Sequence, residues 1–397
     1  MQFDLSGKKV LVTGGTGFIG GRLVERLVLE CNADVRVLVH NFAHVPRIAR
    51  FPVEMVHGDV TKFDDVERAV RGCEIVVHCA YGNQGSKKMR RLVNVEGTRN
   101  VMEAALHAGV RRVVHLSTAM VYGIMTDGDI DETVPKRYSG DVYADSKLDA
   151  EKIAFRYVEQ GLPVVVIQPT AVYGPFASVW TVRVLQRLKI GQMILVNGGE
   201  GLHNVVYIDD VVSAILLAAV KKEAVGEAFL ISGEQPITWR DFYGRYERML
   251  GISATVSMSA AEAEAYYRKR QKHRGLLKEV IHILYEEPSV RERILQTREI
   301  AALKGIASFL LPEQVKRSLK GRIMSNSRSV QITLKEERPI HPLSPSQIRF
   351  YALKKRVHID KARRILGYRP AFDFESGMRL TEQWARWANL LDIGKGL

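Results

Sequence analysis

Near its start the chain passes from a short apolar run directly into a glycine-rich turn and then into an amphipathic stretch. Residues 8–14, KKVLVTG, are typical of a buried strand, and the turn is TGGTGFIG, residues 13–20. Glycines serve such a turn because the chain bends tightly, a pyrophosphate approaches the backbone, and the helix packs closely on the sheet. The N-terminus of the next helix attracts phosphate charge. Strand, turn and helix together predict a dinucleotide site, against the alternative of a glycine-rich turn without a ligand.

The alternation of strand-like and helix-like stretches continues through the first half of the chain. Helix-like stretches such as 20–30 and 94–109 separate further β-branched runs at 34–40, 53–59, 74–80, 110–118 and 163–170. Strands that are apolar on both faces and alternate with helices indicate a parallel sheet covered on both sides. We therefore predict an α/β fold, a doubly wound Rossmann parallel sheet.

After about residue 175 the alternation loosens. We predict that residues 1–175 form an NAD(P)-binding Rossmann domain, to which a helix and a strand at 205–233 return. Residues 176–204 and 234–397 are predicted to form a smaller, discontinuous substrate-binding domain. Within it we expect a helix at 238–250 capped by Thr238 and Asp241, a proline-rich connector at 338–350, and two last helices joined by GYRP.

The positive charge of the chain is concentrated in one region. Residues 262–369 hold 25 Lys or Arg against 11 Asp or Glu, which accounts for the whole net charge of +14. The segment at about 255–340 is predicted to be a basic helical insertion. Its stretches 275–287 and 300–323 place apolar residues at helical spacing against Lys and Arg, which fits two lid helices or, as the alternative, a peripheral membrane contact through 262–338.

Several features bear on location. The longest apolar run, 211–220, has about half the ~20 residues that cross a bilayer, and the first residues lack a signal-peptide pattern. The three cysteines, Cys31, Cys73 and Cys79, are odd in number and lack the paired spacing of a metal or redox site. We expect a cytoplasmic protein, peripheral at a membrane in the alternative above, with buried thiols and no metal.

The end of the second strand bears on cofactor choice. An acidic residue there binds the ribose 2′-hydroxyl of NAD, but this chain has Val39, His40 and Asn41. His40, with Arg47 and Arg50 nearby, is suited to receive a 2′-phosphate, so NADP is favoured over NAD. The alternative is that His40 only covers the adenine.

Several motifs occur together in a characteristic order: TGGTGFIG, GDV at 58–60, VVHCA at 76–80, NVEGTRNVMEAA at 94–105, HLSTAMVYG at 115–123, YADSK at 143–147, QPTAVYGP at 168–175 and VVYIDDVV at 205–212. With them the chain resembles the extended short-chain dehydrogenase/reductase superfamily, the NAD-dependent epimerase/dehydratase family, which includes UDP-galactose 4-epimerase, dihydroflavonol reductase and 3β-hydroxysteroid dehydrogenase. The resemblance covers about residues 5–250 and resumes at KARRILGYRP. It implies cofactor contacts from Gly14, Thr16, Gly17, Phe18, Ile19, Asp59, Val60, Ala80, Lys147 and Pro169, in addition to His40.

The same resemblance implies a catalytic set. In this superfamily a Ser or Thr after the fifth strand works with Tyr-x-x-x-Lys about 25 residues later, and Thr118 precedes Tyr143 by 25 residues. Tyr143 would exchange the proton of a carbinol. Lys147 lies one turn away, where its charge is expected to lower the phenol pKa from near ~10. Thr118 would hold the substrate oxygen; the alternative for the pair is one turn of an exposed helix.

Departures from the family narrow the reaction. Dehydratases of the family carry Asp-Glu after the catalytic Thr, where this chain has Ala119 and Met120, so dehydration is disfavoured. Met120 is expected to contact substrate. Gln168 stands where many relatives have Arg. Asp209 and Asp210 are expected to cap the following helix.

His203 and Asn204 fall where nucleotide-sugar enzymes of the family contact the substrate diphosphate; the alternative is a surface turn before a buried strand. The leading hypothesis is an oxidoreductase or epimerase for a nucleotide sugar, with keto reduction favoured over 4-epimerisation. A reductase of an apolar, sterol-like ketone is the alternative, and a non-catalytic cofactor-sensing or RNA-binding scaffold is a third hypothesis that the intact Thr118, Tyr143 and Lys147 disfavour. The resemblance implies a homodimer through 94–107 and 143–160, and nucleic acid is not an expected partner.

Overall fold

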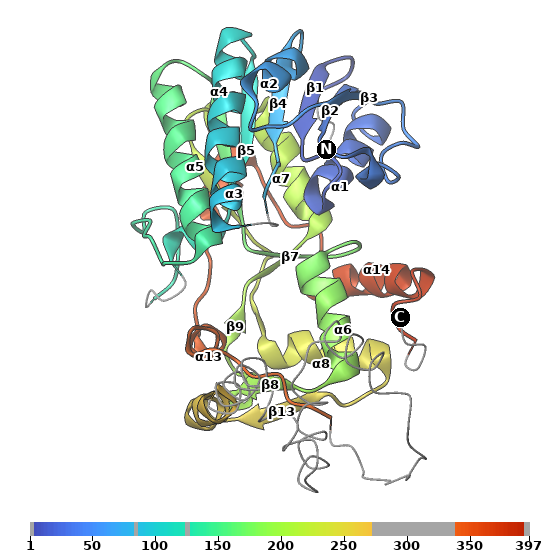
Figure 1. The fold of residues 1–397 in the computed structure, drawn as a ribbon, viewed down its shortest axis with the longest axis vertical. Helices are drawn as coiled ribbons and strands as arrows, with labels where there is room; N and C mark the ends of the chain where they lie inside the picture. Colours follow the sequence, from blue (N-terminus) through green and yellow to red (C-terminus); the bar gives the residue numbers. More distant parts are fainter. Residues whose placement is uncertain (1–3, 83–85, 124–127, 272–337, 393–397) are drawn as a thin grey trace, which may run out of the picture.

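A computed structural model describes residues 4–82, 86–123, 128–271 and 338–392 of the chain, and the structural statements that follow concern these residues. They form a broad upper part built on a large sheet and a smaller lower part (Figure 1). Most of the basic insertion, residues 272–337, lies outside the described residues, as do the stretches 275–287 and 300–323.

A parallel sheet of seven strands is the centre of the upper part. Its strand order is β11-β6-β5-β4-β1-β2-β3, and every neighbouring pair is parallel. In that order the strands are Ala228–Ile231, Val164–Pro169, Arg112–Leu116, Ile75–His78, Lys9–Thr13, Asp34–Val39 and Glu54–His57. The predicted doubly wound Rossmann sheet is confirmed, with each predicted strand within a few residues of its place.

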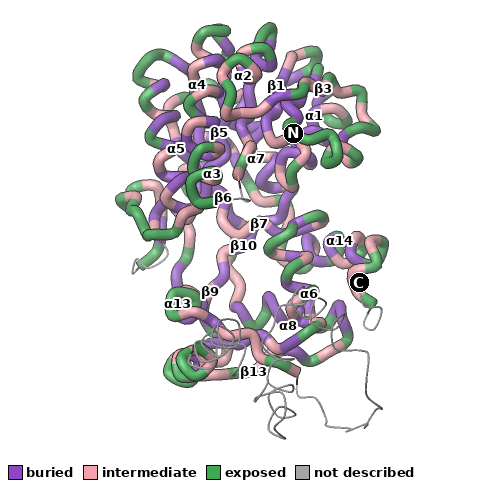
Figure 2. The backbone as a smooth tube through the Cα atoms, viewed as in Figure 1, coloured by how far each residue is buried: buried purple, intermediate pink, exposed green. Residues whose placement is uncertain are grey.

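Both faces of this sheet are buried, because successive side chains of a strand point to opposite sides. In β1, Val10 and Val12 pack into one core and Leu11 into the other. Helices α1 (Phe18–Leu29) and α7 (Ile208–Val220) cover the first face. Helices α2 (Phe63–Val70), α4 (Gly97–His107) and α5 (Val142–Glu159) cover the second, so that the strands lie between two layers (Figures 1 and 2).

The lower part consists of short sheets and helices. Its strand pairs are β7 (Ala171–Tyr173) with β10 (Val205–Tyr207), β8 (Met193–Val196) with β13 (Thr255–Met258), and β9 (Leu202–His203) with β12 (Ile237–Thr238). Its helices are α6 (Arg183–Ile190), α8 (Trp239–Leu250), α13 (Pro345–Ala352) and α14 (Phe374–Trp387).

The upper and lower parts together also contain shorter elements. These are α3 (Lys87–Arg91) and single turns at Phe42–His44, Leu92–Glu96, Ala119–Tyr122, Ser178–Val182, Asn197–Gly199, Lys222–Ala224 and Ala362–Leu366.

The structure confirms some of the predicted local elements in this region and corrects others. Thr238 and Asp241 form the predicted capping box of α8. The helical segment expected from about 255 begins instead with a strand, because Thr255–Met258 pair with β8, and residues 260–271 are then helical. The expected connector contains helix α13, since Ser344 caps it and Pro345 occupies its first turn, where proline is tolerated. The division into two domains stays a prediction.

Two further observations concern the described residues. None of their helices combines the length and apolarity that crossing a membrane requires. Cys31 and Cys73 are buried, Cys79 is half-buried, and all three are free thiols.

Candidate functional site

The residues expected to bind the cofactor come together at one edge of the sheet. Since all seven strands are parallel, their carboxyl ends meet at the same edge, where doubly wound folds bind ligands. Gly14 follows β1, His40 follows β2, Ala80 follows β4, and Pro169 ends β6. This edge faces the lower part of the molecule, next to β7 (Figure 1).

The glycine-rich turn has the close packing that a dinucleotide site requires. Gly14 has a φ of +70°, and a Cβ there would lie 2.7 Å from the backbone nitrogen of Ala80. A Cβ at Gly20 would lie 2.2 Å from the Gly14 oxygen, whereas one at Gly17 would meet only that oxygen, at 3.2 Å. Gly17 therefore leaves open space beside α1, and no side chain caps this helix. Its first N–H groups and the open space at Gly17 fit a pyrophosphate.

The end of β2 differs from the sequence-based expectation in its arginines. Arg47 and Arg50 both bind the carboxylate of Glu25 on α1, at 2.8 and 3.1 Å. Burial raises the pKa of Glu25, but the ion pairs with Arg47 and Arg22 outweigh burial and lower it. Glu25 was not predicted from the sequence, although a carboxylate within the apolar stripe of α1 indicates a buried ion pair. His40 is 78% exposed, and its Nδ1 lies 3.6 Å from Oδ2 of Asp59.

Thr118, Tyr143 and Lys147 meet at the end of β5. Asp141 caps α5 and so places Tyr143 in its first turn, with Lys147 one turn later. Thr118 is buried and lies near the Tyr143 hydroxyl, whose pKa it lowers. Lys147 Nζ donates to the backbone oxygen of Leu116 at 2.8 Å. The ring of Tyr81 packs edge-on against Tyr143, with ring centroids 5.0 Å apart.

The proton affinities of this set are governed by burial. Burial raises the pKa of Tyr143 to about 12, and the Thr118 hydrogen bond opposes the rise. Burial lowers the pKa of Lys147 to about 8, against the attraction of Cys79 and Glu151. The expected lowering of the phenol pKa by Lys147 is therefore not what the structure shows: the groups that act on the Tyr143 pKa do not include Lys147, whose ammonium donates to the backbone oxygen of Leu116.

Behind this set lies a buried polar layer that the sequence analysis missed. Nδ1 of His78 lies 2.7 Å from the hydroxyl of Thr13, and its Nε2 lies 3.0 Å from that of Thr98. Asn94 donates to Ser146 on α5 at 3.0 Å and accepts from the nitrogen of Gly82. The signal was present, since a polar residue interrupts each of the apolar strands VVHCA and VVHLS.

His203 and Asn204, the predicted contacts to a substrate diphosphate, both lie within the lower part of the structure. His203 is 2% exposed, and its ring stacks on Trp239 with centroids 3.7 Å apart. The side chain of Asn204 donates to the oxygen of Lys355 and accepts from the nitrogen of Val357, both at 2.9 Å. The Asn204 amide is thus hydrogen-bonded within the protein, whereas the His203 ring is buried with its Nε2 unpaired among the described residues. Met120 lies two residues after Thr118 and is half-buried.

Asp209 and Asp210 lie in the first turn of α7 but do not cap it. Asp209 pairs with Arg22 of α1, at an Oδ1–Nε distance of 2.5 Å. Asp210 accepts from the backbone nitrogens of Ala371 and Phe372. These two carboxylates therefore join α7 to α1 and to the end of the chain. Within the described ranges, no group of three His, Cys, Asp or Glu side chains is arranged to hold a metal ion.

Comparison with known proteins shows the family of the chain. The model of the NAD dependent epimerase/dehydratase family matches residues 10–232. The chain belongs to this family, and its predicted place in the extended short-chain dehydrogenase/reductase superfamily is confirmed. It is an enzyme of the nicotinamide-dependent oxidoreductase and epimerase class.

Among individual proteins, the chain is similar to a 2-alkyl-3-oxoalkanoate reductase of Stenotrophomonas maltophilia, with 31% identity over 268 residues that cover 64% of this chain and 80% of that protein. A 3-beta-hydroxysteroid dehydrogenase of Mycolicibacterium neoaurum is 31% identical over 256 residues, 59% of this chain and 68% of that protein. The UDP-glucose 4-epimerase of Thermotoga maritima has a similar structure, with a TM-score of 0.65, 19% identity and coverage of 96% and 99%. That likeness shows the fold alone.

Proposed function

We propose that the protein reduces the ketone of an apolar substrate to a secondary alcohol, and catalyses the reverse oxidation, with NADP as the favoured cofactor. Thr118, Tyr143 and Lys147 are the proposed catalytic residues. The cofactor contacts predicted above are proposed for the edge at which their strands end.

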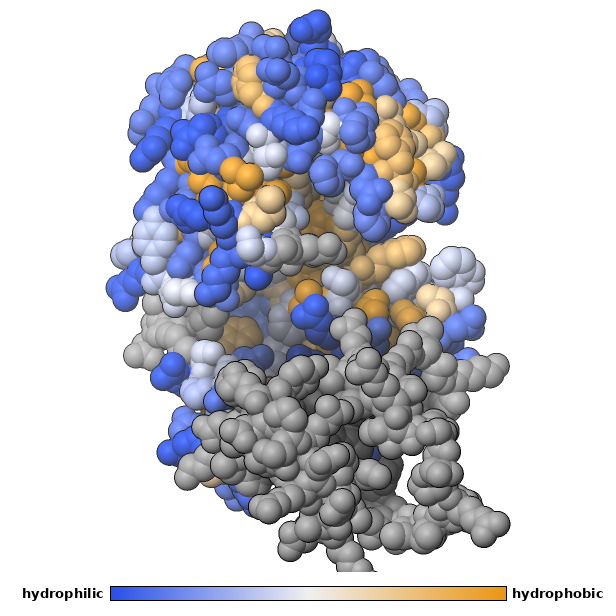
Figure 3. Space-filling view, viewed as in Figure 1, coloured by the Kyte–Doolittle hydropathy of each residue, from blue (hydrophilic) through white to orange (hydrophobic). Residues whose placement is uncertain are grey.

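The engagement of His203 and Asn204 carries the choice of substrate class. The His203 ring is buried against Trp239 and the Asn204 amide is hydrogen-bonded to backbone groups, which supports an apolar substrate over a nucleotide sugar. Relatives named as a 2-alkyl-3-oxoalkanoate reductase and a 3-beta-hydroxysteroid dehydrogenase act, by name, on an alkyl-substituted oxo acid and on a steroid, whose skeletons are largely hydrocarbon. On the face shown in Figure 3, apolar side chains line the hollow between the upper and lower parts.

In this mechanism the chain binds and protonates the substrate oxygen. A bound nicotinamide supplies the hydride that the carbonyl carbon receives. Thr118 donates a hydrogen bond to the carbonyl oxygen and holds it beside Tyr143. Because the pKa of Tyr143 is raised to about 12, the phenol is protonated at neutral pH and gives its proton to the oxygen as the alkoxide forms. The Lys147 ammonium stabilises the phenolate that remains.

The preference for NADP rests on the end of β2. His40 is exposed there, and Val39 and Asn41 bring no carboxylate to repel a 2′-phosphate. Arg47 contributes less than its sequence position suggests, since Glu25 binds it. Titration with NADPH and NADH measures the preference. His40→Asp is expected to reverse it, and tighter binding of NADH by the unaltered protein would refute the proposal.

The reaction is tested with deuterium-labelled NADPH and two panels, one of apolar ketones and one of nucleotide sugars. We expect stoichiometric transfer of the label into an apolar alcohol, with equal consumption of cofactor. Interconversion of two sugars with catalytic cofactor and no net oxidation would instead establish an epimerase. Turnover of sugar ketones alone would restore the nucleotide-sugar hypothesis.

A further inference from the structure

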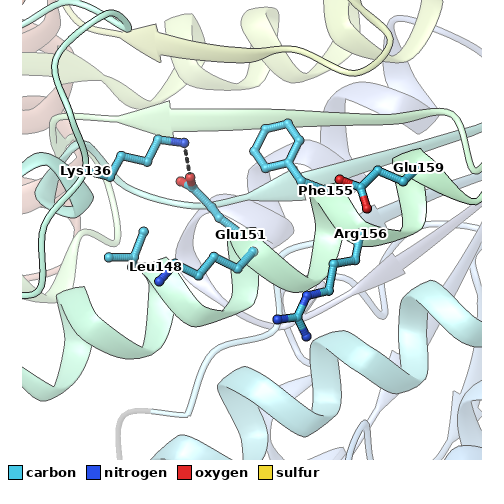
Figure 4. A pocket seen from close by; sticks show the side chains of 7 residues that line it. Lys136, Leu148, Glu151, Phe155, Arg156 and Glu159 are labelled. Atoms are coloured by element: carbon cyan, nitrogen blue, oxygen red, sulfur yellow. Dashed lines mark hydrogen bonds and ion pairs between the residues drawn. The ribbon is translucent and has the colours of Figure 1, made fainter.

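A buried carboxylate lies on α5 behind the proposed catalytic residues. Glu151 is 1% exposed and stands one turn after Lys147 and two turns after Tyr143. A buried charge is costly unless it is paired and hydrogen-bonded. Its Oε2 accepts from Nζ of Lys136, as Figure 4 shows, and its Oε1 accepts from Nε2 of Gln168 at 2.7 Å.

The chain of contacts extends from Gln168 to the segment after Thr118. Gln168 is fully buried in β6, directly before Pro169, and its Oε1 accepts from the hydroxyl of Tyr122 at 2.9 Å. Tyr122 ends the short turn Ala119–Tyr122 that Thr118 caps. Glu151 and Gln168 therefore connect α5, which carries Tyr143 and Lys147, to the segment that starts at Thr118.

Lys136 brings the positive charge to this chain of contacts. It lies in the loop before α5, and its side chain is 23% exposed. Nζ lies 5.2 Å from the ring centroid of Phe155 and 5.8 Å from that of Tyr122, where aromatic faces favour a cation. Gln168 is neutral and stands where many relatives have Arg. In this chain, the cation paired with Glu151 therefore comes from the loop before α5 and not from strand β6.

We infer that Lys136 and Gln168 are positioning residues for the proposed reaction: by binding Glu151 they hold α5 in the register that brings Tyr143 and Lys147 to Thr118. This inference rests on the proposed function for its catalytic consequence. Its structural half, that Lys136 is the counter-ion of Glu151, stands on the contacts alone.

The inference is first tested without a substrate, by thermal unfolding of the full-length protein. Lys136→Ala leaves Glu151 without a cation, and we expect Tm to fall by about 5–10 °C. Gln168→Arg brings a guanidinium to the same carboxylate. In the Lys136→Ala background it is expected to recover at least half of the lost Tm, whereas in the unaltered protein it adds a second cation and lowers Tm.

Arg156→Ala is the matched control, because Arg156 lines the same pocket as Lys136 in Figure 4 and is exposed. It is expected to change Tm by less than about 2 °C. A Lys136→Ala variant that matches this control, or a Gln168→Arg effect of equal sign and size in both backgrounds, would overturn the assignment of Lys136 as the counter-ion.

The second test asks whether the contacts position the catalytic groups. We expect Lys136→Ala to lower kcat about 10- to 100-fold with little change in KM, because a small displacement of Tyr143 is costly to the chemical step. The Lys136→Ala/Gln168→Arg variant should recover most of this loss. A lower Tm with an unchanged kcat would show that Lys136 has only a structural role, and it would refute the positioning role.

The pH profile separates charge from general loosening. Lys147 is faced by Glu151 from α5, by His78, Cys79 and Tyr81 from β4 and the residues after it, and by His115 from β5. Glu151 favours the protonated ammonium. Glu151→Gln should therefore move the alkaline limb of the kcat profile to lower pH, and Lys136→Ala should move it to higher pH. Shifts in one common direction would contradict the inference.

Failure of the proposed function gives a different pattern. If Tyr143→Phe retains full turnover, or if no carbonyl is reduced, the catalytic assignment is wrong while the thermal cycle still decides whether Lys136 pairs with Glu151. If Tyr143→Phe is inactive and Lys136→Ala is not, the function holds and the positioning role fails.

Discussion

The edge of the large sheet and the interior of the lower part both bury polar aromatic side chains, but with different surroundings. At the edge, Thr118 lies near the hydroxyl of the half-buried Tyr143, and His78 is bonded on both ring nitrogens. In the lower part, His203 lies among Trp180, Trp239 and Phe242, and its Nε2 has no partner within the described residues. Burial at the edge therefore sets proton affinity next to the proposed catalytic residues, whereas in the lower part it serves packing.

The largest effect is expected from Tyr143→Phe. Because this change removes the proton donor but leaves the glycine-rich turn untouched, turnover should fall by ~10²–10⁴-fold while cofactor affinity and Tm stay near their original values. Steady-state kinetics, cofactor titration and thermal unfolding measure the three quantities.

Tyr138→Phe is the matched control, since Tyr138 is 55% exposed and bonds to Asp149 on the surface. It should keep turnover. Lys147→Ala, by contrast, is expected to weaken both turnover and cofactor binding. A Tyr143→Phe variant that is unstable but active would show that burial at the sheet edge serves packing, as it does in the lower part.

Trp239→Ala is expected to have the opposite profile. Trp239 is 1% exposed and packs on His203 and on Tyr351, at centroid distances of 3.7 and 4.2 Å. Removing such a ring costs about 3–5 kcal/mol of unfolding free energy, and the affinity for cofactor should be unchanged. Urea unfolding and cofactor titration check both statements.

Trp387→Ala provides the comparison, because Trp387 is 78% exposed on α14 and its removal should cost less than about 1 kcal/mol. If folded Trp239→Ala protein lost cofactor binding, the aromatic cluster around Trp239 would have to contribute to the proposed cofactor site.

The upper part could be predicted from the sequence because its signals are local. Each strand is a short β-branched run, and Gly14, Gly17 and Gly20 lie in one turn, so pattern and spacing predicted both the sheet and the edge where ligands bind. Thr118, Tyr143 and Lys147 were predicted together from a spacing that the superfamily shares. The structure brings them to one place.

What could not be predicted depends on contacts between distant residues. Glu25 binds Arg47 and Arg50 across more than 20 positions, and Glu151 binds Gln168 and Lys136 from three separate elements. No local pattern marks these partners. His203 appeared equally suited to a ligand contact and to a turn, because its neighbours Trp180 and Trp239 come from segments that only the folded chain brings together.

The smallest of these effects concerns acid stability, and His203→Phe isolates it. Burial lowers the pKa of His203 to about 3, against ~6.5 in an unfolded chain. Below pH ~6.5 the unfolded state therefore binds a proton that the folded state does not. The free energy of unfolding consequently decreases as the pH is lowered. One such histidine removes about 2 kcal/mol of stability between pH 7 and pH 5. Phenylalanine keeps the ring against Trp239 and cannot titrate, so the variant should lose that much less stability over this interval in urea unfolding, at unchanged turnover. An equal pH dependence in His203→Phe would mean that this ring is accessible to protons in the folded state, and a loss of turnover would return His203 to the substrate site.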